Sequence, residues 1–304
     1  RRGFERTVAL MDSGADNWEQ RPYMPLYDQA NWFADGERFT LPDDFYSSRF
    51  LVDKTIEFIE SNVEDGKPFF AYVPFQAVHI PVQAPQAYID KYRGVYDGGW
   101  GVLRHQRLVS AVKLGIVPAD TAMVDMSTTD DWSALDEQRQ RYEAKRMAVY
   151  AGMVDAMDHH IGRLVAHLER QGKLDNTVFI FLSDNGAEGS LATRQLGDNP
   201  AAPALIMNAW MRASGFNTDI ETLGEIDSYH DIGPSWASAA VGPLAWYKFF
   251  ASEGGMRVPL VIGGKVNGQP VTANIGAVSQ SFAWITDIAP TVLQLAGAVD
   301  LPSD

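Results

Sequence analysis

The sequence has no cysteine among its 304 residues. This absence excludes disulfide bonds and zinc sites built from thiolates. It leaves the cellular compartment open, because both periplasmic and cytoplasmic proteins can lack cysteine.

Long apolar runs and clusters of positive charge are also missing. No stretch approaches the roughly 20 apolar residues that a membrane-spanning helix needs, so no transmembrane segment is expected. The 25 Lys and Arg residues are outnumbered by 39 Asp and Glu residues, which gives a formal net charge of −14. Nucleic acid is therefore not expected as a partner. An anionic small molecule can still bind, because a local cation and a few placed donors outweigh distant screened charge.

The start of the chain also lacks the features of a natural N-terminus. The sequence opens on Arg1-Arg2-Gly3, with no initiator methionine and no apolar signal segment. It ends shortly after an apolar, helix-like segment. We therefore expect the chain to be a piece of a longer protein.

The sequence does contain apolar patterns typical of alternating helices and strands. Helical spacing occurs over residues 48–63 and, most clearly, over 136–170, where apolar residues recur at three- and four-residue intervals. Short apolar runs at 68–75, 177–183 and 257–263 are predicted to be strands. A helix followed by a strand occurs twice, which predicts an α/β fold with a layered, mostly parallel sheet flanked by helices.

The most informative motif follows the strand predicted at 177–183, where Asp184, Asn185 and Gly186 come in succession. Open α/β sheets bind their ligands just beyond the carboxyl ends of such strands. Carboxylate and amide oxygens are hard ligands that suit Ca²⁺ or Mg²⁺. On this motif alone, an ordinary Asp-Asn-Gly turn explains the residues equally well.

Two further residues could act together with such a metal. His79 follows the run 68–75, and Lys248 precedes the run 257–263. A metal and a lysine would balance the charge of a transferring anionic oxyacid group, while a histidine could donate a proton or hydrogen bond to an oxygen. Each residue alone is a weak signal, since a single histidine is usually structural and a lysine among aromatics usually lies at the surface.

Taken in this order, the segments resemble the formylglycine-dependent sulfatases of the alkaline-phosphatase-like superfamily, bacterial arylsulfatases in particular. The resemblance covers nearly the whole chain. Its strongest elements are three motifs: Lys67-Pro68-Phe69-Phe70-Ala71-Tyr72 with His79-Ile80-Pro81, Phe181-Leu182-Ser183-Asp184-Asn185-Gly186, and Gly254-Gly255-Met256-Arg257-Val258-Pro259.

The resemblance implies a hydrolase of small-molecule sulfate esters with one Ca²⁺ ion in each intact site. Asp184 and Asn185 match two of the family's calcium ligands. His79 matches the histidine that hydrogen-bonds the sulfate or the leaving oxygen, and Lys248 matches the lysine that binds the sulfate oxygens. Glu188 is expected to be an exposed loop charge, with a supporting role in the metal loop as the alternative.

The family's nucleophile is missing from this chain. Family members carry a Cys or Ser in a C/S-x-P-x-R signature whose first residue becomes formylglycine, and no such signature occurs here. The family's first calcium-binding Asp pair is missing too. We therefore expect the formylglycine and the remaining ligands upstream of this chain. Residues 1–304 would be the middle-to-C-terminal part of one sulfatase catalytic domain, inactive alone.

Within that domain, we expect residues 1–47 to be an irregular covering segment, 85–135 a helical insertion and 190–243 a loop excursion. The insertion and the excursion are expected to shape substrate choice.

Two other functions stay open. A phosphatase or phosphodiesterase of the same superfamily would need further His and Asp metal ligands, for which His230-Asp231 is the nearest candidate. A noncatalytic sulfatase-like binding protein would keep the pocket without the chemistry, and an upstream C/S-x-P-x-R signature would exclude it.

Overall fold

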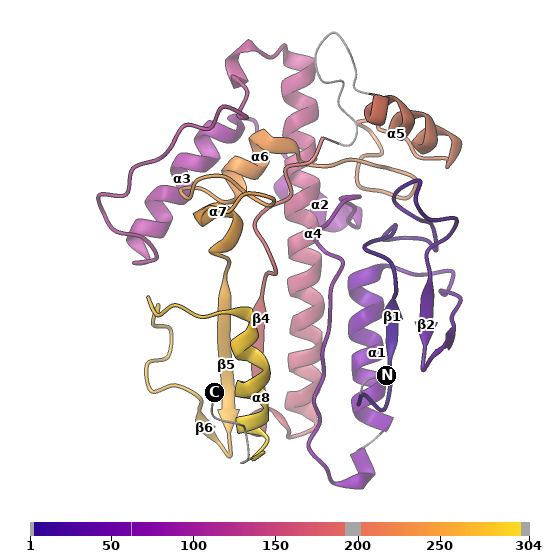
Figure 1. Ribbon diagram of the computed structural model, residues 1–304, viewed down its shortest axis with the longest axis vertical. Helices are drawn as coiled ribbons and strands as arrows, with labels where there is room; N and C mark the ends of the chain where they lie inside the picture. The colour runs from indigo at the N-terminus through magenta and orange to yellow at the C-terminus, as the bar shows by residue number, and fades with distance from the viewer. Residues whose placement is uncertain (1–2, 62, 192–201, 299–304) are drawn as a thin grey trace.

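The structure is a computed structural model that describes residues 3–61, 63–191 and 202–298. One long helix, α4 (Glu137–Arg170), runs along the middle of the molecule (Figure 1). A small sheet with helix α1 (Ser47–Ser61) lies on one side of it, and a second sheet with helix α8 (Ile288–Leu295) lies on the other. Among the described residues, no helix is both long and apolar enough to cross a membrane.

Helix α4 confirms the helix predicted over 136–170. It begins where the Asp136 side chain accepts a hydrogen bond from the Arg139 N–H at 2.7 Å, and it ends before Gly172, whose φ is 64°. Its buried side packs against α1 and against the short helix α2 (Gln86–Ile89). At this crossing, a Cβ on Gly152 would lie 2.9 Å from the Ile89 backbone nitrogen, so only glycine allows the two helices to approach so closely.

Residues 1–47 show no steady periodicity, yet they contain an antiparallel sheet of three short strands. These are β1 (Val8–Leu10), β2 (Trp32–Ala34) and β3 (Glu37–Arg38). Trp32 is 2% exposed and packs edge-on against Phe45 and Phe50, which join the sheet to α1. This cluster forms one of the molecule's cores.

The second sheet corrects the predicted strand orientation. It consists of β4 (Val178–Leu182), β5 (Leu260–Val266) and β6 (Gln269–Pro270), and β4 pairs antiparallel with β5 with Ile180 opposite Ile262. The combination of helices and sheets confirms the α/β class. The mostly parallel arrangement is not found, because every ladder between these six strands is antiparallel. The long connection leaves β4 at Leu182 and enters β5 at Leu260, directly opposite, so β5 runs the other way.

The run 68–75 is also not a strand in the described part of the chain. Its backbone pairs with no neighbouring strand there, and Phe70 and Tyr72 are 60% and 70% exposed. A strand requires a partner that accepts and donates its ladder hydrogen bonds, and none of the described segments lies in that position.

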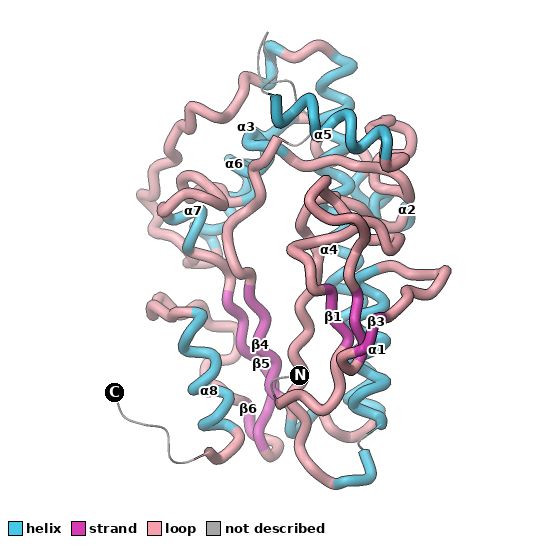
Figure 2. Tube along the Cα trace, turned by 45° about the vertical axis from the view of Figure 1, so that its right-hand side comes forward, coloured by secondary structure: helices cyan, strands magenta, loops and turns pink. Residues whose placement is uncertain are grey.

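The remaining helices are α3 (Gly99–Lys113), α5 (Ala202–Ala213), α6 (Gly233–Ala240) and α7 (Glu253–Met256). Figure 2 shows α3, α5 and α6 at one end of the molecule and the two sheets at the other. The largest core lies at the helical end, where Trp100, Trp132 and Trp236 meet edge to face with ring centroids 4.8–5.9 Å apart.

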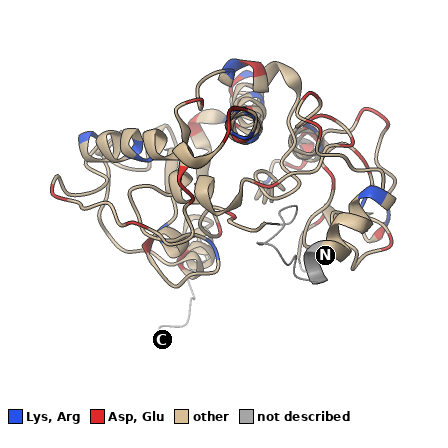
Figure 3. Ribbon diagram, turned by 90° about the horizontal axis from the view of Figure 1, so that it is seen from above, with Lys and Arg blue, Asp and Glu red and all other residues tan. Residues whose placement is uncertain are grey.

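A buried charge network ties α4 to the segment before α6. Arg146 donates two hydrogen bonds to Glu143, at 2.9 and 2.7 Å, and pairs with the carboxylate of Asp231. Its Nε also donates to the Asp231 carbonyl at 2.7 Å. All three residues are at most 5% exposed. Viewed end-on in Figure 3, α4 carries both basic and acidic residues.

His230, next to this network, should make the fold sensitive to acid. The side chain is 0% exposed, and burial together with the charge of Arg146 lowers its pKa to about 3. An unfolded histidine has a pKa of about 6.5, so below that value the unfolded state binds more protons than the folded state. We expect the free energy of unfolding to fall as the pH drops from about 6.5 toward 3.

Urea unfolding between about pH 7.5 and pH 4.5 measures this effect. His230→Gln should flatten the acid slope, whereas His105→Gln, at an exposed position of α3, should leave it unchanged. An equal slope in wild type and His230→Gln would contradict the assignment.

Candidate active site

The loop that follows β4 carries Asp184 and Asn185 and rests on helix α7. The Ser183 hydroxyl donates to the Asn185 carbonyl at 2.8 Å, and the Gly186 N–H donates to the Gly255 carbonyl at 3.0 Å. A Cβ on Gly186 would lie 1.9 Å from the Gly254 oxygen, so the backbone of the Asp184 loop packs directly against the backbone of α7. Asp184 is exposed and Asn185 is partly buried. The loop therefore presents its oxygen donors at the surface of the site.

Lys248 lies on the segment between α6 and α7, directly beside this loop. Its backbone N–H donates to the Ala187 carbonyl at 3.1 Å. The Gly254 N–H in turn donates to the Ala245 carbonyl at 2.9 Å. Two segments that are far apart in the sequence therefore converge: the Asp184 loop, and the stretch that runs from Lys248 to the glycine pair in α7.

Glu188 holds the Lys248 side chain in place. The Nζ of Lys248 lies 2.7 Å from Oε2 of Glu188, and their side chains are 19% and 9% exposed. The other oxygen of Glu188 accepts hydrogen bonds from the backbone N–H, at 3.0 Å, and the hydroxyl of Ser190. Burial alone would raise the pKa of Glu188, but the bonds from Lys248 and Ser190 outweigh it and hold the pKa below its ordinary value.

Glu188 was expected to be an exposed loop charge, and that expectation is wrong. The sequence neighbours of the two residues do not mark this pair, because a lysine among aromatic residues usually lies at the surface and Glu188 and Lys248 are 60 positions apart.

The ring of His79 is fixed from two sides. Its Nδ1 lies 2.8 Å from the Ile80 carbonyl, which can only accept a hydrogen bond, so Nδ1 carries a proton. The edge of the Tyr23 ring packs against the imidazole, with centroids 5.5 Å apart and planes at 84°. The Tyr23 hydroxyl lies 2.9 Å from the Ser13 hydroxyl. Nε2 is then the ring nitrogen that can meet a ligand.

Tyr23 also connects His79 to the Lys248 side of the site. Burial raises the pKa of the Tyr23 hydroxyl, and the nearby carboxylate of Glu188 adds to the shift. The structure therefore brings together Lys248, Asp184 and Asn185, through the Ala187 carbonyl and Glu188. His79 contacts Ile80 and Tyr23, and the Tyr23 hydroxyl in turn senses the charge of Glu188. Sequence reasoning did not find Tyr23, because no motif marks it.

Asp184 and Asn185 fit calcium in donor chemistry but not in number. Both offer hard oxygen donors, whereas Ca²⁺ takes six to eight oxygen ligands. Across residues 3–61, 63–191 and 202–298, no group of three or more His, Cys, Asp or Glu side chains is assembled for a metal. These two residues can therefore supply only part of a calcium site.

His230 and Asp231, the residues considered for a phosphatase-type metal site, lie in the core. Both are 0% exposed, and the Asp231 carboxylate is paired with Arg146. This arrangement suits a structural ion pair.

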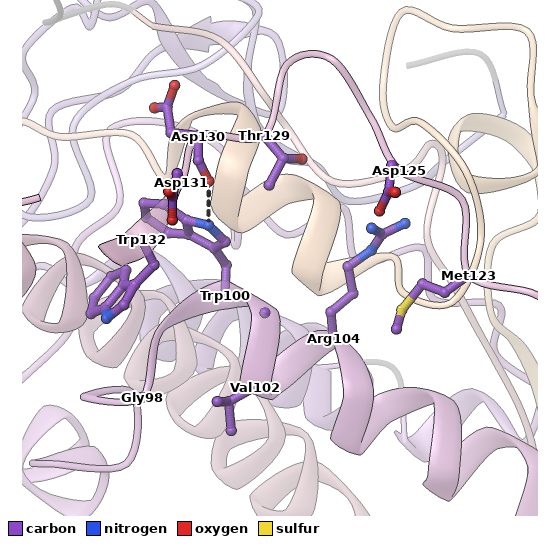
Figure 4. Close-up of a pocket in the computed structure, with 11 residues that line it drawn as sticks. Gly98, Trp100, Val102, Arg104, Met123, Asp125, Thr129, Asp130, Asp131 and Trp132 are labelled. Carbon is purple, nitrogen blue, oxygen red and sulfur yellow. Dashed lines mark hydrogen bonds between the residues drawn. The ribbon is translucent and has the colours of Figure 1, made fainter. Parts of the chain in front are cut away.

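A cavity of about 660 Å³ lies between α3 and residues 123–132 (Figure 4). Trp100, Arg104 and Asp125 are among the residues that line it, and Arg104 points toward Asp125. The stretch 123–132 contacts the Lys248 segment, because the hydroxyls of Thr128 and Tyr247 lie 2.9 Å apart. The residues predicted as a helical insertion therefore reach the site.

Comparison with known sequences gives a consistent result along the chain. The Sulfatase family model matches residues 1–298. An uncharacterised sulfatase of Schizosaccharomyces pombe is 36% identical, over 97% of this chain and 52% of the relative. An arylsulfatase of Klebsiella aerogenes is 31% identical, over 97% of this chain and 61% of the relative. The chain thus spans 52% and 61% of the length of these two relatives.

Solved structures show the same fold. The crystal structure of Ps i-CgsB in complex with k-i-k-neocarrahexaose has a TM-score of 0.54 at 19% identity, over 99% of this chain and 47% of that one. A protein in complex with its substrate D-glucosamine-2-N,6-O-disulfate has a TM-score of 0.53 at 19% identity, over 99% of this chain and 56% of that one.

Proposed function

The chain belongs to the sulfatase family, and from this we propose that the intact protein is a sulfuric ester hydrolase of the arylsulfatase type. The convergence of Lys248 with the loop carrying Asp184 and Asn185 is the main structural support. A lysine ammonium held beside a loop with two hard oxygen donors supports the proposal, and His79 would add a ring nitrogen. Such a set suits an ester whose negative charge is spread over several oxygens.

Lys248 would bind the sulfate oxygens. Its ammonium is a compact charge with three donors, and Glu188 holds it beside the metal loop. Asp184 and Asn185 would ligate one calcium ion together with residues outside this chain. When bound, calcium would add positive charge at the sulfate oxygens.

His79 would assist the leaving oxygen. Because Nδ1 donates to the Ile80 carbonyl, Nε2 is the nitrogen that could contact the ester. Nε2 can donate a hydrogen bond only when the ring carries two protons. The reactive form would therefore be the imidazolium, oriented by the Ile80 carbonyl and by the edge of Tyr23.

We assign the nucleophile to sequence outside this chain. The chain has no cysteine and no C/S-x-P-x-R signature, and it covers only part of the length of its relatives. A formylglycine formed there would complete the site. Alone, the chain would bind the anion without turning it over.

Turnover by the full-length protein, expressed with a formylglycine-generating enzyme, tests this function. We expect hydrolysis of 4-nitrophenyl sulfate to exceed that of 4-nitrophenyl phosphate, to stop after chelation and to return with Ca²⁺. A preference for the phosphate would favour the phosphatase alternative. Sulfate binding without turnover by the matured protein would favour the binding-only alternative.

His79→Asn should lower turnover about 100-fold for an ester with a poor leaving group, since general acid catalysis contributes at least that much. The loss should shrink for 4-nitrophenyl sulfate, whose leaving oxygen needs less help. His105→Asn, on the exposed part of α3, is the matched control and should retain full activity. A loss independent of the leaving group would contradict the assigned role.

A further inference from the structure

Glu188 neutralises the cation that would bind the substrate. The Lys248–Glu188 distance is 2.7 Å, and Glu188 is only 9% exposed, so bulk solvent screens the pair little. The pair has no net charge, although each partner alone would impose a full charge on the site. This matters for the choice of ligand, because a sulfate monoester carries one negative charge and a phosphate monoester carries about 1.5 to 2 near neutral pH.

We propose that Glu188 determines the charge selectivity of the site, matching it to monoanionic sulfate esters and disfavouring dianionic phosphate esters. The inference rests on the proposed function of the same site. Glu188 would act as a specificity-determining residue, in addition to holding Lys248.

The geometry keeps the Glu188 carboxylate close to the bound anion. One oxygen is held by Lys248 and the other by the N–H and hydroxyl of Ser190, so the group cannot turn away. The backbone behind it is fixed as well, since a Cβ on Gly189 would lie 2.2 Å from the Tyr247 ring. An anion that contacts Lys248 must therefore approach a fixed negative charge. The repulsion grows with the charge of the anion.

Glu188→Gln removes the charge and keeps the shape. The amide oxygen can still accept a hydrogen bond from Lys248 or from Ser190. A role limited to positioning Lys248 would thus be largely preserved, whereas a role in charge selectivity would be lost. Glu57→Gln is the matched control, because Glu57 forms a surface ion pair with Lys54 on α1 at 2.6 Å and changes the net charge equally.

The experiment measures dissociation constants of methyl sulfate and methyl phosphate by calorimetry, on the full-length protein with Ca²⁺ at about pH 8, where the phosphate ester is dianionic. In Glu188→Gln we expect the preference for methyl sulfate over methyl phosphate to fall about tenfold, equivalent to about 1.4 kcal/mol. Glu57→Gln should keep the wild-type preference. Turnover of 4-nitrophenyl sulfate is followed in parallel.

The outcomes separate the two levels of the proposal. An unchanged preference in Glu188→Gln, or an equal weakening of both anions, overturns the charge-selectivity role even if sulfate turnover is normal. Binding of neither anion by the wild type overturns it too. A preference that depends on Glu188 in a wild type that does not hydrolyse aryl sulfate supports the inference and overturns the proposed function.

Discussion

Replacing Lys248 by Met is expected to lower kcat/KM for 4-nitrophenyl sulfate roughly 10³-fold, the upper end of what one donor to a developing charge contributes. Met keeps the length of the apolar stem and removes only the ammonium. Lys248 is the cation placed against the Asp184 loop, through both its backbone and its side chain. Steady-state kinetics of the full-length, matured protein measures the change.

The single variant also leaves Glu188 buried without a counter-charge, which could weaken the fold. Lys248→Met combined with Glu188→Gln removes that problem, because neither position of this pair then carries a charge. Lys265→Met, which breaks the exposed pair with Asp175 on the surface of β5, serves as the control and should be as active as wild type. If the double variant kept more than about one tenth of the activity, Lys248 would not be the sulfate-binding cation.

The long helix and the strand before Asp184 were predictable because their signals are local. Helix α4 combines an apolar stripe with an Asp136 cap and a closing Gly172, all within one segment. β4 is a short apolar run between turn residues. Neither element has to be matched with a distant segment before it can be predicted.

Strand orientation and pairing could not be predicted in the same way. An apolar run is equally compatible with a parallel or an antiparallel neighbour. β4 pairs with β5 across about eighty residues of intervening chain, and its direction depends on how that connection returns. The run 68–75 is apolar enough for a strand, but pairing requires a neighbour that the described residues do not supply.

In the candidate site, too, the residues with local sequence signals could be predicted and those that depend on distant contacts could not. Asp184, Asn185 and His79 stand in short motifs and Lys248 comes shortly before one, so the sequence could single them out. The residues that orient them do not, because Glu188 and Tyr23 acquire their roles only from contacts across the fold. A motif marks the groups that touch a ligand, whereas the charge and orientation of those groups depend on residues far away in the sequence.

Arg146→Met should cause the largest loss of stability, about 3–5 kcal/mol in the free energy of unfolding. The change removes the buried cation that the carboxylates of Glu143 and Asp231 share, at positions 5% and 0% exposed, while Glu143 keeps its pair with the more exposed Arg139 at 2.7 Å. Removing one partner of a buried ion pair costs far more than the pair itself contributes, because the remaining charge is poorly solvated. Urea unfolding at neutral pH measures the difference.

Two comparisons identify the cause of that loss. Arg163→Met, on the same helix, breaks an exposed pair with Asp53 and should cost about 1 kcal/mol or less. Adding Glu143→Gln and Asp231→Asn to Arg146→Met removes the two buried carboxylate charges and should restore much of the stability. If the triple variant were as unstable as the single one, the loss would come from packing or hydrogen bonding around the guanidinium. The buried charges would then not be the cause of the loss. Packing and hydrogen bonding, more than ion pairing, would hold α4 against the segment before α6.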